Sequence, residues 1–148
     1  MSKLISLGAT FFGIGYIPYI SGTVASAVAI LLYLLVARNL YLYLTVTVLL
    51  TVFGFFISGK AERIFKQKDS RFIVIDEVSG MLIALAGLNY SIRAILAAFV
   101  FFRIFDTLKV YPISRLQHLK GSVGVMCDDL LASVYTIVFV SLFLKFTS

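Results

Sequence analysis

The sequence contains few of the residues on which most catalytic and metal-binding sites of soluble enzymes depend. Among its 148 residues there is one cysteine and one histidine, and there is no tryptophan. The single cysteine, Cys127, excludes a disulfide within the chain and a metal site built from several cysteines. The single histidine, His118, excludes any mechanism that needs two histidines in one chain. The seven Asp and Glu residues are therefore the main candidates for chemistry.

The composition is typical of a membrane protein. Hydrophobic residues make up 61% of the chain and charged residues 14%, against about 25% charged residues in a typical soluble domain. With a mean hydropathy of +1.04, the chain cannot be an ordinary soluble globular domain, and it has far more apolar surface than a disordered chain tolerates. We therefore expect one membrane-embedded domain, residues 1–148, with an all-α fold.

Five apolar stretches predict a polytopic integral membrane helical bundle with about five membrane helices. The stretches are residues 21–37, 41–58, 72–88, 92–105 and 130–146. A helix needs about 20 residues to cross a bilayer, so each stretch is short for a full crossing. Residues 4–20 are apolar but rich in Gly, Pro and Tyr, and we expect them to form an interfacial or re-entrant segment.

The distribution of basic residues predicts the orientation in the membrane. If every stretch crosses, nine cationic residues lie on the side of the N-terminus and three on the other side. The nine are Lys3, Lys60, Arg63, Lys66, Lys68, Arg71, Lys109, Arg115 and Lys120, and the three are Arg38, Arg93 and Lys145. Cytoplasmic loops carry the excess of Lys and Arg, so we expect a cytoplasmic N-terminus and an external C-terminus. Anionic headgroups, not nucleic acid, are the expected partners of the basic side.

The same topology places all seven carboxylates on the cytoplasmic side. Five of them lie at the edges of apolar stretches, where ionisable groups usually face the bundle interior or a watery cavity. These five are Asp76, Glu77, Asp106, Asp128 and Asp129. Brought together, they would repel one another unless protonated or bridged by a cation, and oxygen ligands without His or Cys suit Mg²⁺ best. Alternatively, Asp128 caps the last helix, and the others pair with Arg103 and Lys109.

Three residues are candidates for binding a phosphate group. On one continuous helix Arg103, Asp106 and Lys109 share a face; Arg can bind phosphate with two parallel hydrogen bonds, and Lys supplies a point charge. The alternative is an internal ion pair between Arg103 and Asp106. Thr23, after Gly22, opens the first apolar helix, whose free N–H groups and dipole could receive an anion. Alternatively, Thr23 is simply the N-cap of that helix.

Four segments, in order along most of the chain, resemble the phosphatidylglycerophosphatase A family. They are Gly13-x-Gly15-x-x-Pro18-x-x-x-Gly22-Thr23, Lys68-Asp69 followed by Ile73-Val74-Ile75-Asp76-Glu77-Val78-x-Gly80, Phe102-Arg103-x-Phe105-Asp106-x-x-Lys109 with Pro112-Ile113, and Gly121-x-x-Gly124-Val125-Met126-x-Asp128-Asp129. The sequence departs from the family pattern at turn and packing positions. Ser21 stands where the family usually has Pro, Val110 where it has Pro, and Ser133 where it has Gly.

The resemblance implies a Mg²⁺-dependent phosphatase of the bacterial cytoplasmic membrane, acting in phospholipid biosynthesis. Such an enzyme converts phosphatidylglycerophosphate to phosphatidylglycerol and inorganic phosphate at the cytoplasmic face. The hypothesis is that the five carboxylates hold one or two Mg²⁺ ions and position or deprotonate the attacking water, while Thr23, Arg103 and Lys109 bind the phosphate.

Two other functions remain open at this point. A small cation or proton transporter could use the same carboxylates as a pathway, but transport favours acids spread across the membrane depth. The predicted outer half contains none. In a non-catalytic assembly subunit, the acids would merely cap helices and pair with basic loops.

Overall fold

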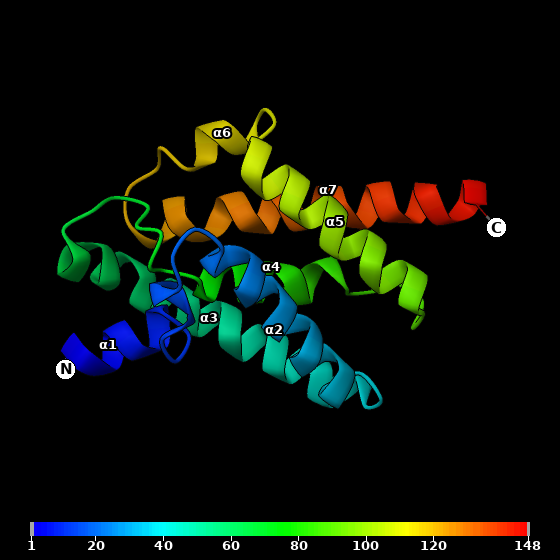
Figure 1. The fold of residues 1–148 in the computed structure, drawn as a ribbon, viewed down its shortest axis with the longest axis horizontal. Helices are drawn as coiled ribbons and strands as arrows, with labels where there is room; N and C mark the ends of the chain where they lie inside the picture. The colour runs from blue at the N-terminus through cyan, green and yellow to red at the C-terminus, as the bar shows by residue number, and fades with distance from the viewer. Residues whose placement is uncertain (1, 148) are drawn as a thin grey trace.

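The computed structural model describes residues 2–147, which form a bundle of helices with no strand. The all-helical fold class is confirmed. In chain order the elements are α1 (Ser2–Ala9), the 3-10 helix η1 (Ile14–Tyr16), α2 (Ser21–Val36), α3 (Leu40–Phe65), α4 (Ile75–Ala84), α5 (Ile92–Leu108), α6 (Ile113–Leu116) and α7 (Ser122–Thr147) (Figure 1).

Among residues 2–147, two helices, not about five, are long and apolar enough to cross a membrane. These are α3 and α7, each of 26 residues, and only 22% of the apolar window of each is buried in the bundle. Large apolar side chains such as Phe53 and Phe56 of α3 point outward instead, as expected for a lipid-facing surface. The predicted number of spans is wrong by this criterion because α2 has 16 residues, α5 has 17 and α4 has only 10.

The short helix α4 forms the centre of the bundle. It is buried along nearly its whole length and packs against α2, α3 and α7. The hydroxyl of Tyr43 in α3 donates a hydrogen bond of 2.5 Å to the carbonyl oxygen of Leu82. After α4 the chain turns at Gly87, whose φ of 75° lies in the left-handed region that favours glycine. The apolar stretch 72–88 is therefore mainly protein core.

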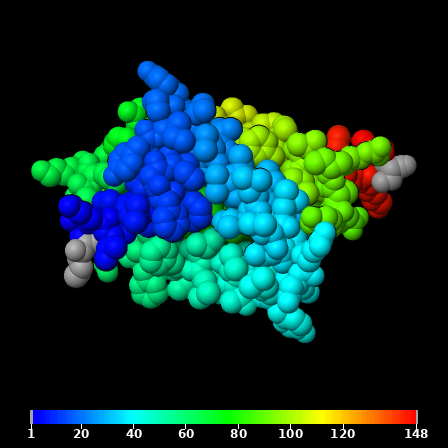
Figure 2. All heavy atoms as spheres, turned by 60° about the horizontal axis from the view of Figure 1, so that its bottom comes forward, coloured from blue at the N-terminus to red at the C-terminus, as the bar shows by residue number. Residues whose placement is uncertain are grey.

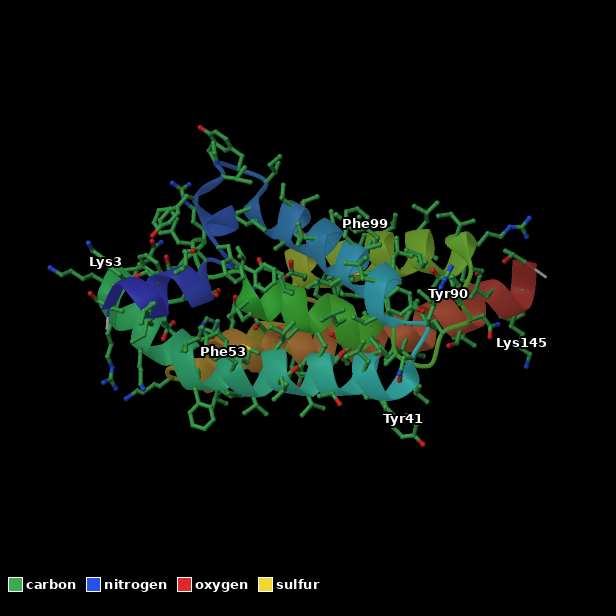
Figure 3. The ribbon with its side chains drawn as sticks, turned by 90° about the horizontal axis from the view of Figure 1, so that it is seen from below. Lys3, Tyr41, Phe53, Tyr90, Phe99 and Lys145 are labelled. Atoms are coloured by element: carbon green, nitrogen blue, oxygen red, sulfur yellow. The ribbon has the colours of Figure 1, made fainter. Side chains whose placement is uncertain are left out.

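Several helices begin or finish at the same end of the bundle. The starts of α2, α4 and α7 and the end of α5 lie there, and the N-terminal segment lies at the same end (Figure 1). Lys3 and Lys145 mark the two ends of the bundle in Figure 3. The segment predicted to be interfacial or re-entrant folds into α1 and η1, and α1 packs beside α3 (Figure 2). Its position in a bilayer stays a prediction.

Two predicted helix starts are corrected by the structure. Helix α7 begins at Ser122, eight residues before the predicted start at 130, so Asp128 lies inside the helix and does not cap it. The amide N–H of Gly59 donates to Ser122 Oγ at 2.8 Å, so contact with α3 stabilises this additional helical segment. In α2 the N-cap is Ile20 and no side chain caps the helix, so Thr23 is not the N-cap.

Candidate active site

Three carboxylates from two helices form what we call the acidic cluster: Asp76 and Glu77 of α4 and Asp129 of α7. One oxygen of each lies within 4.8 Å of the others, the one such group of three or more potential ligands within residues 2–147. Asp76 and Asp129 are buried, with 7% and 2% of their surface exposed. Asp76 Oδ1, Glu77 Oε2 and Asp129 Oδ2 are buried without a hydrogen-bond partner among the described residues.

The local sequence explains why these carboxylates meet. Asp76 and Glu77 occupy the first turn of α4, where the partial positive charge of a helix N-terminus favours carboxylates. Gly80 lets α7 approach closely, because a Cβ at this position would lie 3.2 Å from Asp129 Cβ. One turn beyond Asp129, Ser133 Oγ donates a 2.7 Å hydrogen bond to the carbonyl oxygen of Gly80. These contacts fix the acidic face of α7 against the start of α4.

The other two predicted site acids lie outside the acidic cluster, because each is paired with a cation. Arg103 Nη1 donates to Asp106 Oδ2 at 2.5 Å, one turn along α5. Lys109 Nζ donates to Asp128 Oδ2 at 2.6 Å. The structure thus divides the five predicted metal ligands into three clustered acids and two ion-paired acids. The alternative prediction, in which acids pair with Arg103 and Lys109, therefore holds for Asp106 and Asp128.

Arg103 and Lys109 keep part of their side-chain surface exposed beside the cluster, 22% and 24% respectively. The start of α2 lies against the same groups. A Cβ at Gly22 would lie 2.5 Å from Glu77 Oε1 and 3.0 Å from Arg103 Nη1. Thr23 follows in the first turn of α2 and is half-buried. The start of α2 and the Arg103 side chain therefore meet at Glu77, on one edge of the acidic cluster, while Lys109 contacts Asp128.

Lys109 lies between two carboxylates, one of which sequence reasoning did not assign to the site. Its Nζ also lies 3.3 Å from Asp69 Oδ2. Burial lowers the pKa of Lys109, but the hydrogen bond and charge of Asp128, followed by the charge of Asp69, outweigh it and raise that pKa above its usual value. These two carboxylates therefore favour the protonated, cationic form of Lys109. The signal for Asp69 was present in the sequence as the Lys68-Asp69 motif, but its 40-residue separation from Lys109 hid the contact.

The arrangement of carboxylates and cations fits metal-assisted chemistry on an anion, and comparison with known proteins gives the family. Residues 7–144 match the family described as Phosphatidylglycerophosphatase A. The chain belongs to the phosphatidylglycerophosphatase A family. The family membership expected from the four motifs is thus confirmed.

Several relatives, two of them named phosphatidylglycerophosphatase A, match most of the chain. The phosphatidylglycerophosphatase A of Haemophilus influenzae is 36% identical over 140 residues, 92% of this chain and 86% of the relative. That of Escherichia coli is 34% identical over 137 residues, 90% of this chain and 80% of the relative. A Bacteroides thetaiotaomicron protein, provisionally named a phosphatidylinositol-3-phosphatase, is 36% identical over 149 residues, 95% of this chain and 93% of the relative. No solved structure matches the chain.

Proposed function

We propose that this protein hydrolyses the terminal phosphomonoester of phosphatidylglycerophosphate, giving phosphatidylglycerol and inorganic phosphate, with Mg²⁺ as cofactor. The observation that carries the proposal is the acidic cluster, in which each of three carboxylates has a buried oxygen with no hydrogen-bond partner within residues 2–147. Arg103 and Lys109 lie beside it and suit a phosphate group. Family membership supports the choice of lipid substrate.

The residues present fit a magnesium ion. Asp76, Glu77 and Asp129 supply only oxygen ligands, which Mg²⁺ prefers, and their mutual repulsion calls for a cation. These three residues would hold the ion, whereas Asp106 and Asp128 orient Arg103 and Lys109 through ion pairs. Mg²⁺ bound there would offset the phosphate charge and stabilise charge that develops on the transferring and leaving oxygens.

The chain itself performs the binding and proton transfer. The Arg103 guanidinium and the Lys109 ammonium donate hydrogen bonds to the phosphate oxygens, and N–H groups at the start of α2 add donors. A carboxylate of the acidic cluster accepts a proton from the attacking water. The phosphorus–oxygen bond to glycerol breaks as the new bond forms, and the leaving oxygen takes up the proton that this carboxylate accepted. The products are an alcohol and inorganic phosphate.

The proposed function is tested by phosphate release from phosphatidylglycerophosphate in detergent. We expect the purified protein to release phosphate with Mg²⁺, to stop when a chelator is added, and to resume when excess Mg²⁺ is restored. Phosphatidylinositol 3-phosphate, suggested by the name of one relative, is assayed in parallel. A faster reaction with that lipid would contradict the proposed substrate. Full activity in chelator would contradict the cofactor, and no release from folded protein would contradict the function.

We also propose a multi-pass orientation in the bacterial cytoplasmic membrane with the site facing the cytoplasm. The end of the bundle at which α3 and α5 finish carries nine of the cations and the end at which they begin carries three, which supports a cytoplasmic N-terminus. The two ends of the chain lie at opposite ends of the bundle (Figure 1), which supports an external C-terminus. An alkaline phosphatase reporter fused at the C-terminus is expected to be active, and a fluorescent protein fused there to be dark. The reverse pattern would contradict this topology.

The transport alternative is not favoured, because the carboxylates are not spread along the bundle. Glu62 and Asp69 join the five site acids at the end where α2, α4 and α7 begin. The opposite end carries the cations Arg38, Arg93 and Lys145. A proton or cation pathway favours acids spread across the membrane depth.

A further inference from the structure

The loop that joins α3 to α4, residues 66–74, contacts several elements that build the site. The backbone carbonyl of Arg71 accepts a 3.2 Å hydrogen bond from Ser21 Oγ at the start of α2. Lys68 Nζ donates a 2.9 Å hydrogen bond to the carbonyl oxygen of His118, in the segment before α7. This connecting loop therefore ties the start of α2 to the segment that precedes Asp128.

Asp69, in the same loop, supplies the second carboxylate at Lys109. The Lys109 ammonium lies 3.3 Å from Asp69 Oδ2 and 2.6 Å from Asp128 Oδ2. The Asp128 side chain is only 3% exposed and that of Asp69 is 40% exposed. Lys109 therefore has one carboxylate partner on its buried side and one on its solvent-exposed side. An ammonium group has three N–H donors, and these two carboxylates leave one for a further acceptor.

The backbone of the loop is held so that Asp69 reaches Lys109. Asp69 has a φ of 48°, in the left-handed region that is uncommon for a residue other than glycine. Its amide N–H donates a 2.7 Å hydrogen bond to Glu62 Oε1, in the last turn of α3. The Glu62 carbonyl oxygen also accepts from the amide of Gln67 at 3.3 Å. Such a conformation persists only where surrounding contacts fix it, and Glu62 supplies them.

We infer that Asp69 is a positioning residue that keeps the Lys109 ammonium turned toward the substrate phosphate. The inference rests on the proposed function, in which Lys109 binds phosphate. A lysine side chain is flexible, and with Asp128 as its only carboxylate partner the ammonium would withdraw toward the buried side of the site. Because an exposed ion pair contributes little to stability, losing Asp69 is expected to change phosphate binding more than folding.

The test compares Asp69→Asn with Lys68→Gln, a matched variant in the same loop. Lys68→Gln removes the contact with His118 but leaves both carboxylate partners of Lys109. We expect Asp69→Asn to raise KM for phosphatidylglycerophosphate, and the inhibition constant of inorganic phosphate, by about 3- to 10-fold, the effect of one weakened hydrogen bond. We expect kcat to change less than twofold, and Lys68→Gln to behave as wild type. An equal rise of KM in both variants would overturn the inference.

A double-mutant cycle shows whether Asp69 acts through Lys109. In the Lys109→Gln background, Asp69→Asn is expected to have no further effect on KM. The same fold-change in both backgrounds would overturn the inference. Asp69→Glu, which keeps the charge, is expected to give a KM between wild type and Asp69→Asn; a KM equal to that of Asp69→Asn would count against it. These outcomes presuppose an active wild type, whose inactivity would instead reject the proposed function.

Discussion

Replacing Asp129 by asparagine is expected to lower phosphate release about 1,000-fold while the protein stays folded. Asp129 is 2% exposed, and its Oδ2 lies in the acidic cluster with no hydrogen-bond partner in the described part of the chain. Asparagine keeps the size of the side chain but removes the charge, so the cluster loses one of its three carboxylates, the groups proposed to hold Mg²⁺. A bound metal contributes several kcal/mol of charge stabilisation in the transition state, and each ~1.4 kcal/mol corresponds to a factor of ten in rate.

The same variant separates loss of the metal site from loss of the fold. Without metal, the Asp129→Asn protein is expected to be at least as stable as wild type, because it has one fewer buried carboxylate in a repelling group. Mg²⁺ should raise the melting temperature of wild type, since an ion at 100 times its Kd adds about 2.7 kcal/mol. This shift should disappear in the variant. An undiminished shift would show that Mg²⁺ binds elsewhere.

Cys127→Ala is the matched control for Asp129→Asn. Cys127 lies two residues earlier in α7 and is half-buried, but it has no part in the acidic cluster. We expect this variant to keep both the activity and the Mg²⁺-dependent shift. Thermal unfolding with and without Mg²⁺, together with phosphate release, measures both. A comparable loss of activity in Cys127→Ala would show that α7 is generally sensitive and that the effect of Asp129→Asn is not specific.

The gathering of the carboxylates at one end of the bundle was predictable from the sequence, but their pairing was not. Counting charges placed the carboxylates on one side, and the structure brings their helix ends together. Whether an acid joins the cluster or an ion pair depends on which neighbouring helix its side of the helix contacts. Asp128 and Asp129 are neighbours in α7, about 100° apart around the helix axis, so one meets Lys109 and the other meets Asp76. That contrast follows only once α7 is known to begin at Ser122.

The prediction from hydropathy that the stretch containing α4 crosses the membrane was wrong for a physical reason. A helix buried among other helices and a helix exposed to lipid are both apolar, so the run 72–88 gave no sign of which it was. The structure makes Ile75–Ala84 a core helix, whereas only 22% of the apolar window of α3, and of that of α7, is buried. The partnership of Asp69 with Lys109 was similarly invisible, because it depends on a loop conformation held by Glu62.

Gly22→Ala is expected to lower kcat/KM about 100-fold without destabilising the protein. The added methyl group would lie 2.5 Å from Glu77 Oε1 and 3.0 Å from Arg103 Nη1, so both side-chain ends must move. They can move at little cost, since they are the far ends of flexible side chains, and alanine favours the helix by about 1 kcal/mol over glycine. Their displacement nevertheless moves Arg103, the proposed hydrogen-bond donor to the phosphate, away from the acidic cluster. A misplacement of ~1 Å in an active site can reduce the rate about 100-fold.

Gly8→Ala provides the matched control, because it makes the same substitution outside the acidic cluster. Its added methyl group would lie 2.9 Å from the Phe53 ring, also at the far end of a side chain. We expect Gly8→Ala to keep the specific activity of the folded protein, measured by phosphate release after size-exclusion chromatography. Wild-type activity in Gly22→Ala would show that the start of α2 lies away from the substrate phosphate. Similar losses in both variants would point to general loosening of the bundle, whereas a loss confined to Gly22→Ala places the phosphate between α2 and the end of α5.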